Sequence, residues 1–177
     1  MEVSMNKPEY IVVHHSLTKD GNVVDTNAII DYHERVLGWK SRSGKSGGYH
    51  GYIEVAGGEL KYFRGRGEDE DGAHCKEFGM NHKSLGVCVV GNFDLTPPPI
   101  QTLFFLRDLC FAWMVNYGIP ASRVLGHRDV GLMAGFDWRK KGPTGIREFK
   151  TCPGSLFPME SLFSMVAGKI DTEGVVR

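Results

Sequence analysis

Histidines and a cysteine at three separate places in the sequence could together bind a metal ion. The adjacent His14 and His15 end the apolar run YIVVHHS, His127 stands in GHRDV, and Cys152 stands in FKTCPG. Two imidazoles and a thiolate are a recognised ligand set for catalytic zinc, in which a fourth position is left for water or substrate. These residue types therefore indicate a candidate zinc site.

Simpler explanations exist for each of these residues. A lone histidine is more often packed or exposed than bound to a metal, and GHRD could be only an Arg128–Asp129 pair at a turn. Cys152 could also be the nucleophile of a thiol hydrolase with a histidine base, although that leaves the two-histidine arrangement unexplained. Spacing alone leaves these alternatives open.

The sequence predicts strands that would place these residues along one edge of a sheet. Unbroken β-branched residues predict a buried strand over 10–16, and SLGVCVVGNF predicts a central strand over 84–93. Alternating runs around Gly57-Gly58 predict a hairpin over 47–64, and RVLGHRD predicts a short strand that ends in a loop. Strand ends in a helix-covered sheet gather along one edge, where binding sites are commonly built.

Three helices are expected around this sheet. The first runs over 26–37 with Thr26 as its cap and Gly38 as its stop, and the second over 99–117 after a proline run. A last short helix is expected in PMESLFSMVAG. The apolar residues expected on the buried faces of the first two are Ile29, Ile30, Val36 and Leu37 with His33, and Leu103, Leu106, Cys110, Trp113 and Tyr117. The pattern predicts an α/β fold, a central mixed β-sheet flanked by helices, in a single domain over 1–177.

Composition excludes several classes of protein. The formal net charge is +0, which argues against nucleic-acid binding driven by bulk charge. Apolar runs are too short to span a bilayer, so no stable membrane insertion is expected. The start, MEVSMNKPEY, lacks the basic-then-apolar order of a secretion signal, which predicts a cytoplasmic location as synthesised.

The remaining cysteines and two other motifs favour structural roles. No CxxC pair is present, and Cys75, Cys88 and Cys110 have apolar neighbours typical of small core residues. SGKSGG resembles a phosphate loop, but its glycines are wrongly spaced and no strand precedes it, so a solvated loop is expected. GEDEDG lacks the alternating ligands of a calcium loop, so a charged turn is expected.

The order of motifs along the chain resembles a known enzyme family. VVHHS, GGYHGYI, GAHCKEFGMNHKSLGVCVVG, LGHRDV and KTCPG follow one another as in the zinc-dependent type 2 N-acetylmuramoyl-L-alanine amidases. That family includes phage endolysins and is related to the peptidoglycan recognition proteins. The resemblance covers residues 10 to 165 and implies the amidase/peptidoglycan-recognition-protein-like fold, in a monomeric zinc amidase domain.

The resemblance assigns metal ligands and catalytic residues. His14, His127 and Cys152 match the zinc ligands; His15 stays an alternative to His14, because neighbours on a strand face opposite sides. Tyr49 matches the family's catalytic tyrosine and Lys150 its basic residue. In an extended segment Lys150 would also share a side with Cys152.

The same resemblance suggests roles for four further histidines and one asparagine. His50, His74 and Asn81 fall in matched segments and are expected to line the substrate groove. His33 and His82 are expected to serve packing or the surface.

The implied reaction is hydrolysis of the amide between N-acetylmuramic acid and L-alanine in peptidoglycan. Zinc would polarise the carbonyl and lower the pKa of bound water toward ~7, while Lys150 stabilises the oxyanion and Tyr49 orients water or assists proton transfer. An endolysin-like, bacteriolytic and antimicrobial role is expected, with lysis once the membrane is breached. A cytoplasmic amidase that recycles muropeptides and a non-catalytic peptidoglycan-binding module are the alternatives.

Two features depart from the compact family pattern. Residues 131–150 are longer than the connection expected in phage enzymes, and they would either shape the substrate groove or pack beside it. No cell-wall-binding module is expected after residue 177, so the catalytic domain itself would find its target.

Overall fold

A five-stranded mixed sheet forms the centre of the described part of the protein. The computed structural model describes residues 7–18, 25–42 and 47–173, and the loop expected at SGKSGG lies largely outside these ranges. The strands are ordered β3-β2-β4-β1-β5, with β2 and β3 antiparallel and the other pairs parallel. Their bounds are β1 Tyr10–His15, β2 Gly51–Ala56, β3 Glu59–Arg64, β4 Ser84–Val89 and β5 Val124–Gly126.

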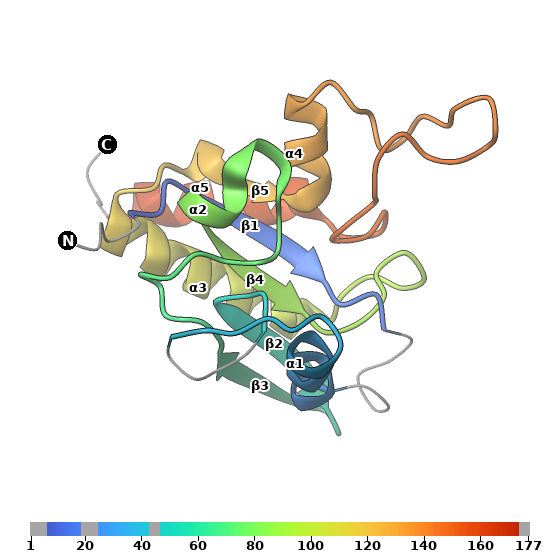
Figure 1. The fold of residues 1–177 in the computed structure, drawn as a ribbon. Helices are drawn as coiled ribbons and strands as arrows, with labels where there is room; N and C mark the ends of the chain where they lie inside the picture. Colours follow the sequence, from blue (N-terminus) through green and yellow to red (C-terminus); the bar gives the residue numbers. More distant parts are fainter. Residues whose placement is uncertain (1–6, 19–24, 43–46, 174–177) are drawn as a thin grey trace.

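Helices lie on both faces of the sheet, so the predicted α/β class is confirmed (Figure 1). The long helices α3 and α5 pack together across one face, while α1, α2 and α4 lie toward the other. Two short 3-10 turns, Glu77–Gly79 and Ala121–Arg123, complete the described elements. The helix bounds are α1 Thr26–Arg35, α2 Met80–Lys83, α3 Ile100–Tyr117, α4 His127–Met133 and α5 Met159–Glu173.

Alternate residues of β1 enter different hydrophobic clusters. Ile11 and Val13 pack in the main core with residues of α3 and α5, whereas Val12 packs on the other side with Met80 and Val130. Because side chains alternate along a strand, β1 is buried on both faces and every residue has a definite side. The central position of β4 beside β1 also agrees with its apolar sequence.

The helix boundaries correct two sequence predictions. Asp25, not Thr26, caps α1: its carboxylate accepts a hydrogen bond from the Ala28 amide at 2.8 Å. Thr26 is buried, and its hydroxyl and amide donate instead to the Glu54 carboxylate. Val36 and Leu37 lie after the end of α1 and are 63% and 42% exposed, so they do not belong to its buried face.

The prediction that Gly126 leads into a loop is also wrong. Helix α4 begins at His127, directly after β5, and the Asp129 carboxylate accepts a hydrogen bond from the Gly126 amide at 2.7 Å. A Cβ atom at position 126 would lie 2.8 Å from the Pro153 ring, so only glycine allows this close approach. His127 is therefore the first residue of a helix held against the Pro153 turn.

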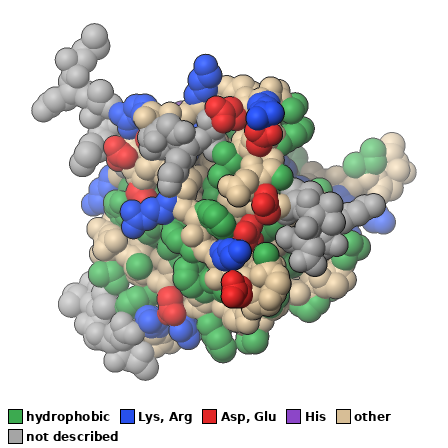
Figure 2. Space-filling view, turned by 90° about the horizontal axis from the view of Figure 1, so that it is seen from below, with side chains coloured by type: hydrophobic (Ala, Val, Ile, Leu, Met, Phe, Trp, Pro, Cys, Tyr) green, Lys and Arg blue, Asp and Glu red, His purple; other side chains and the backbone are tan. Residues whose placement is uncertain are grey.

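The outer surface agrees with the balanced composition. Figure 2 shows the lower side of the molecule as drawn in Figure 1, where acidic and basic side chains are interspersed among apolar ones. On this face the basic side chains do not form the continuous patch that is typical of nucleic-acid binding. Among the described residues, no helix is both long enough and apolar enough to cross a membrane.

The cap of α1 provides a test of this fold. Asp25→Ala should lower the free energy of unfolding by about 1 kcal/mol, because the Ala28 amide loses its acceptor. Asp25→Asn keeps an acceptor oxygen and should retain most of that stability. Urea unfolding followed by circular dichroism measures both variants, and wild-type stability in Asp25→Ala would contradict the capping role.

Candidate metal and catalytic centre

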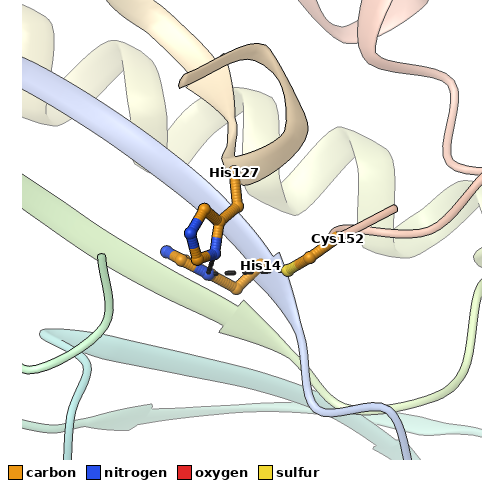
Figure 3. A group of neighbouring side chains, drawn as sticks. All are labelled: His14, His127 and Cys152. Carbon is orange, nitrogen blue, oxygen red and sulfur yellow. Dashed lines mark hydrogen bonds between the residues drawn. The ribbon is translucent and has the colours of Figure 1, made fainter. Parts of the chain in front are cut away.

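The three expected ligands converge from three separate segments of the chain (Figure 3). His14 comes from the end of β1, His127 from the start of α4, and Cys152 from the turn before α5. The two Nδ1 atoms lie 3.1 Å apart, and the Cys152 sulfur lies 3.5 Å from His14 Nδ1. All three side chains are buried. The structure thus brings together the residues that the sequence predicted as ligands.

Strand alternation separates His14 from His15. His14 shares the side of Val12 and points to His127 and Cys152, whereas the His15 ring accepts a hydrogen bond from the Phe93 amide at 3.2 Å. The His15 ring also lies beside the Phe93 ring. Geometry therefore favours His14 over His15 as the ligand.

Hydrogen bonds to backbone hold the turn that carries Cys152. The Arg128 amide donates to the Cys152 carbonyl, and its buried guanidinium donates to the carbonyls of Gly154 and Phe157. On the other side, the Asp94 carboxylate accepts from the Thr151 hydroxyl at 2.7 Å. The sequence indicated Arg128 only as a turn residue and did not indicate Asp94. Both hold the sulfur in place.

The chemistry of the donor set fits a zinc ion. Tetrahedral ligands with bonds of ~2.0–2.3 Å stand roughly 3.3–3.6 Å apart, and the observed 3.1 and 3.5 Å separations lie close to that range. His127 Nε2 lies 3.0 Å from a carboxylate oxygen of Glu77, which can only accept, so Nδ1 of neutral His127 carries a lone pair. That lone pair is on the side of His127 that faces His14 Nδ1, the atom nearest the Cys152 sulfur.

Burial keeps the metal-free donors uncharged at neutral pH. Burial, with smaller effects from His127 and His74, lowers the pKa of His14 well below its usual value. Burial and then Lys150 lower the pKa of His127 to about 4, against an opposing effect of Glu77. Burial raises the pKa of the Cys152 thiol to about 12. The imidazoles are thus ready to bind a cation, while the thiol must lose a proton.

Each of the two candidate histidine ligands has a partner on its other nitrogen. His14 Nε2 lies 3.0 Å from His74 Nδ1, and Glu77 faces His127 in the same way. His74 therefore contacts a ligand as well as lining a cavity. The sequence reasoning missed Glu77, although it is the one acidic residue in the matched segment GAHCKEFGMNH. Such outer partners fix the orientation of metal-binding imidazoles.

Tyr49 and Lys150 lie next to the ligands. The Tyr49 ring centroid is 5.1 Å from that of His14, and burial raises the pKa of the phenol well above its usual value. The Lys150 ammonium lies 3.9 Å from Glu77, and its side chain is 50% exposed. A neutral phenol and an accessible cation thus flank the cluster.

Lys150 lines two hollows in the surface. One has a volume of about 360 Å³ and is lined by residues that include His127, His74 and Asn81. The other, of about 740 Å³, is lined partly by residues 146–149 of the long segment between α4 and α5. That segment extends away from the sheet in Figure 1, so it contributes a wall of a hollow beside Lys150.

Two residues expected in the groove are used within the protein. His50 is 2% exposed; its Nδ1 accepts from the Gly86 amide, and its Nε2 donates to the Glu70 carbonyl, each at 2.9 Å. These contacts support a structural role for His50 rather than the expected contact with substrate. Asn81 lines the smaller hollow, but its side-chain oxygen accepts from the amides of His74 and Cys75.

The other histidines and cysteines behave largely as expected. His33 is buried against Trp39, and exposed His82 pairs with Asp71. Cys88 and Cys110 are buried in hydrophobic clusters. Cys75 is buried too, but with Glu77 and His127 it forms a second group whose spacing could hold a metal ion.

Comparisons with known proteins agree with this geometry. The family model described as N-acetylmuramoyl-L-alanine amidase matches residues 4–155. The endolysin of Enterobacteria phage T3 is 34% identical over 134 residues, covering 71% of this chain and 78% of the endolysin. Peptidoglycan-recognition protein LB of Drosophila melanogaster is 29% identical over 128 residues, which cover 68% of this chain and 51% of that protein.

A solved structure shows the same fold. The endolysin N-acetylmuramoyl-L-alanine amidase LysCS from Clostridium intestinale URNW superimposes with a TM-score of 0.66 and 29% sequence identity. The superposition covers 91% of this chain and 84% of that one. Since the family model spans most of the sequence and the fold agrees, the chain belongs to the N-acetylmuramoyl-L-alanine amidase family.

Proposed function

We propose that this chain is a zinc-dependent amidase domain that cleaves the bond between N-acetylmuramic acid and L-alanine in peptidoglycan. The convergence of His14, His127 and Cys152, with Tyr49 and Lys150 beside them, carries this proposal. Membership of the amidase family and the similarity to phage endolysins support it.

The roles of the residues follow from their positions. A bound zinc ion would supply Lewis acidity toward the scissile carbonyl and lower the pKa of a water molecule. Lys150, accessible at the two hollows, stabilises the negative charge that develops on the carbonyl oxygen. The Tyr49 phenol keeps its proton at neutral pH and can donate a hydrogen bond that orients the attacking water.

Two other functions find less support. A thiol hydrolase needs a cysteine whose pKa is lowered, whereas burial raises the pKa of Cys152 to about 12. A non-catalytic recognition module, suggested by the similarity to Drosophila peptidoglycan-recognition protein LB, does not need a thiol grouped with two uncharged imidazoles. The complete set of donors favours an enzyme.

The first test concerns the metal and its ligands. The purified protein should contain about one zinc per chain, and Cys152→Ser should lose most of it, because serine is a poor soft ligand. Cys75→Ser and Cys110→Ser should keep zinc near one and remain folded. Atomic absorption measures metal content; loss of zinc in Cys75→Ser with retention in Cys152→Ser would assign the metal to the second group instead.

The second test concerns the reaction. Digestion of purified peptidoglycan should release peptides that begin with L-alanine and create no new reducing ends, measured by amino-terminal labelling and a reducing-sugar assay. Lys150→Ala should keep its zinc and lose about 10²–10³ in turnover, as expected for an oxyanion stabiliser. New reducing ends without new amino termini would refute the amidase. Comparing intact sacculi with soluble muropeptides separates lysis from recycling.

The third test uses pH. His14 and His127 carry no proton to displace above about pH 6, but the Cys152 thiol does, because its pKa is raised to about 12. Zinc binding should therefore release one proton and tighten about tenfold for each unit of rising pH near pH 6, where a zinc-bound water with a pKa toward ~7 still keeps its protons. Competition with a chelator measures the slope. A slope of zero, or of two protons near pH 6, would contradict these protonation states.

A further inference from the structure

Glu77 lies at the junction between the ligand cluster and Lys150. One carboxylate oxygen is 3.0 Å from His127 Nε2, and the other is 3.9 Å from the Lys150 ammonium. The Cys75 sulfur lies 3.5 Å from the oxygen that faces His127. The Glu77 side chain is 17% exposed, so these contacts are largely shielded from water. Neither the ligand set nor the catalytic pair explains this carboxylate.

The backbone next to Glu77 is strained. The next residue, Phe78, has φ +53° and ψ +21°, a left-handed conformation that is costly for a bulky side chain. Phe78 is 50% exposed, so burial of its ring does little to offset that cost. The turn is anchored on its amino-terminal side by Asn81, which accepts from the amides of His74 and Cys75.

The contact with His127 determines where that imidazole carries its proton. A carboxylate only accepts hydrogen bonds, so neutral His127 keeps its N–H on Nε2 and its lone pair on Nδ1. Nδ1 is the atom that faces His14 and lies in the ligand group with Cys152. A carboxylate partner of this kind also increases the electron density of a metal-binding imidazole.

We propose that Glu77 is a positioning residue that holds His127 with Nδ1 free to bind zinc and draws Lys150 to the same side of the site. This inference rests on the proposed function, because it takes His127 as a zinc ligand. Most of the effect acts through His127, since the exposed Lys150 ammonium at 3.9 Å forms a weaker pair.

A second metal ion among Cys75, Glu77 and His127 fits the same contacts less well. His127 would then have to bind metal through both nitrogens and carry no proton. The Lys150 ammonium beside Glu77 would also repel a second cation. The hydrogen bond between Glu77 and His127 therefore explains why Cys75, Glu77 and His127 lie together better than a second metal ion does.

Nuclear magnetic resonance of the ¹⁵N-histidine-labelled zinc protein tests the proposal without relying on activity. Wild type should show a slowly exchanging, downfield Nε2 proton from His127. Glu77→Gln, whose amide oxygen still accepts, should keep this signal at a less downfield position. Glu77→Ala should lose it and weaken zinc binding about 10–100-fold, with a smaller loss in Glu77→Gln. Asp71→Ala removes the carboxylate from exposed His82, a matched control that should leave zinc affinity unchanged.

The steady-state constants add a second readout. Both Glu77 variants should lower kcat while KM stays close to wild type. The reason is that Glu77 affects catalysis by positioning His127 and Lys150 and does not bind the substrate itself. An unchanged Nε2 signal and unchanged zinc affinity in Glu77→Ala would overturn the proposal, as would two zinc ions per wild-type chain with one lost in Cys75→Ser. If Glu77→Ala does not fold, the test uses Glu77→Gln alone. Zinc affinity equal to wild type, together with an unshifted His127 Nε2 proton signal, would then overturn the proposal. A wild-type chain that binds no zinc would instead overturn the proposed function.

Discussion

Burial of β1 on both faces is the constraint on which the site depends. Between β4 and β5, Ile11 and Val13 enter the main core, and Val12 packs with Met80 and Val130 on the opposite side. A shift of one residue would exchange these faces, moving Ile11 and Val13 out of the main core and turning His14 away from the other donors. The free energy of packing the core therefore also orients His14 toward the site.

The buried donors His14, His127 and Cys152 are held in place by polar contacts with the surrounding structure. Arg128 and Asp94 hold the Cys152 turn, and Glu77 and His74 contact the second nitrogens of the two histidines. Three of these four residues are charged and form hydrogen bonds with groups that would otherwise lack partners in a buried region. The same contacts that satisfy those groups also limit the movement of the ligands.

The long segment between α4 and α5 packs beside the candidate site. It is mostly exposed, yet Trp138 lies 4.6 Å from the Arg128 guanidinium, and the Phe136 ring stacks on Phe149. The segment is thus packed against a residue that also holds the Cys152 turn. Its residues 146–149 line the larger hollow beside Lys150.

The sequence by itself determined the five strands, three of the helices (α1, α3 and α5), the mixed sheet and the three ligand candidates, because apolar periodicity and short motifs can be read along the chain. It predicted the hairpin over 47–64 and the central strand at 84–93, both of which the structure contains. Periodicity alone could not separate His14 from His15, because it does not reveal which face of a strand is filled by helices, and the choice of His14 rested on the family resemblance. Only the packing of α3 and α5 against the Ile11 and Val13 side decided which face that is.

Tertiary structure also decided the residues whose roles depend on distant partners. Glu77 meets His127 fifty positions along the chain, and Asp94 meets Thr151 across 57. His50 looked like a groove residue in its motif, but two backbone groups, from Gly86 and Glu70, take both of its nitrogens. A side chain's hydrogen-bond partners are set by the folded neighbourhood, so spacing along the chain identifies candidate donors and acceptors but not which of them remain free for chemistry.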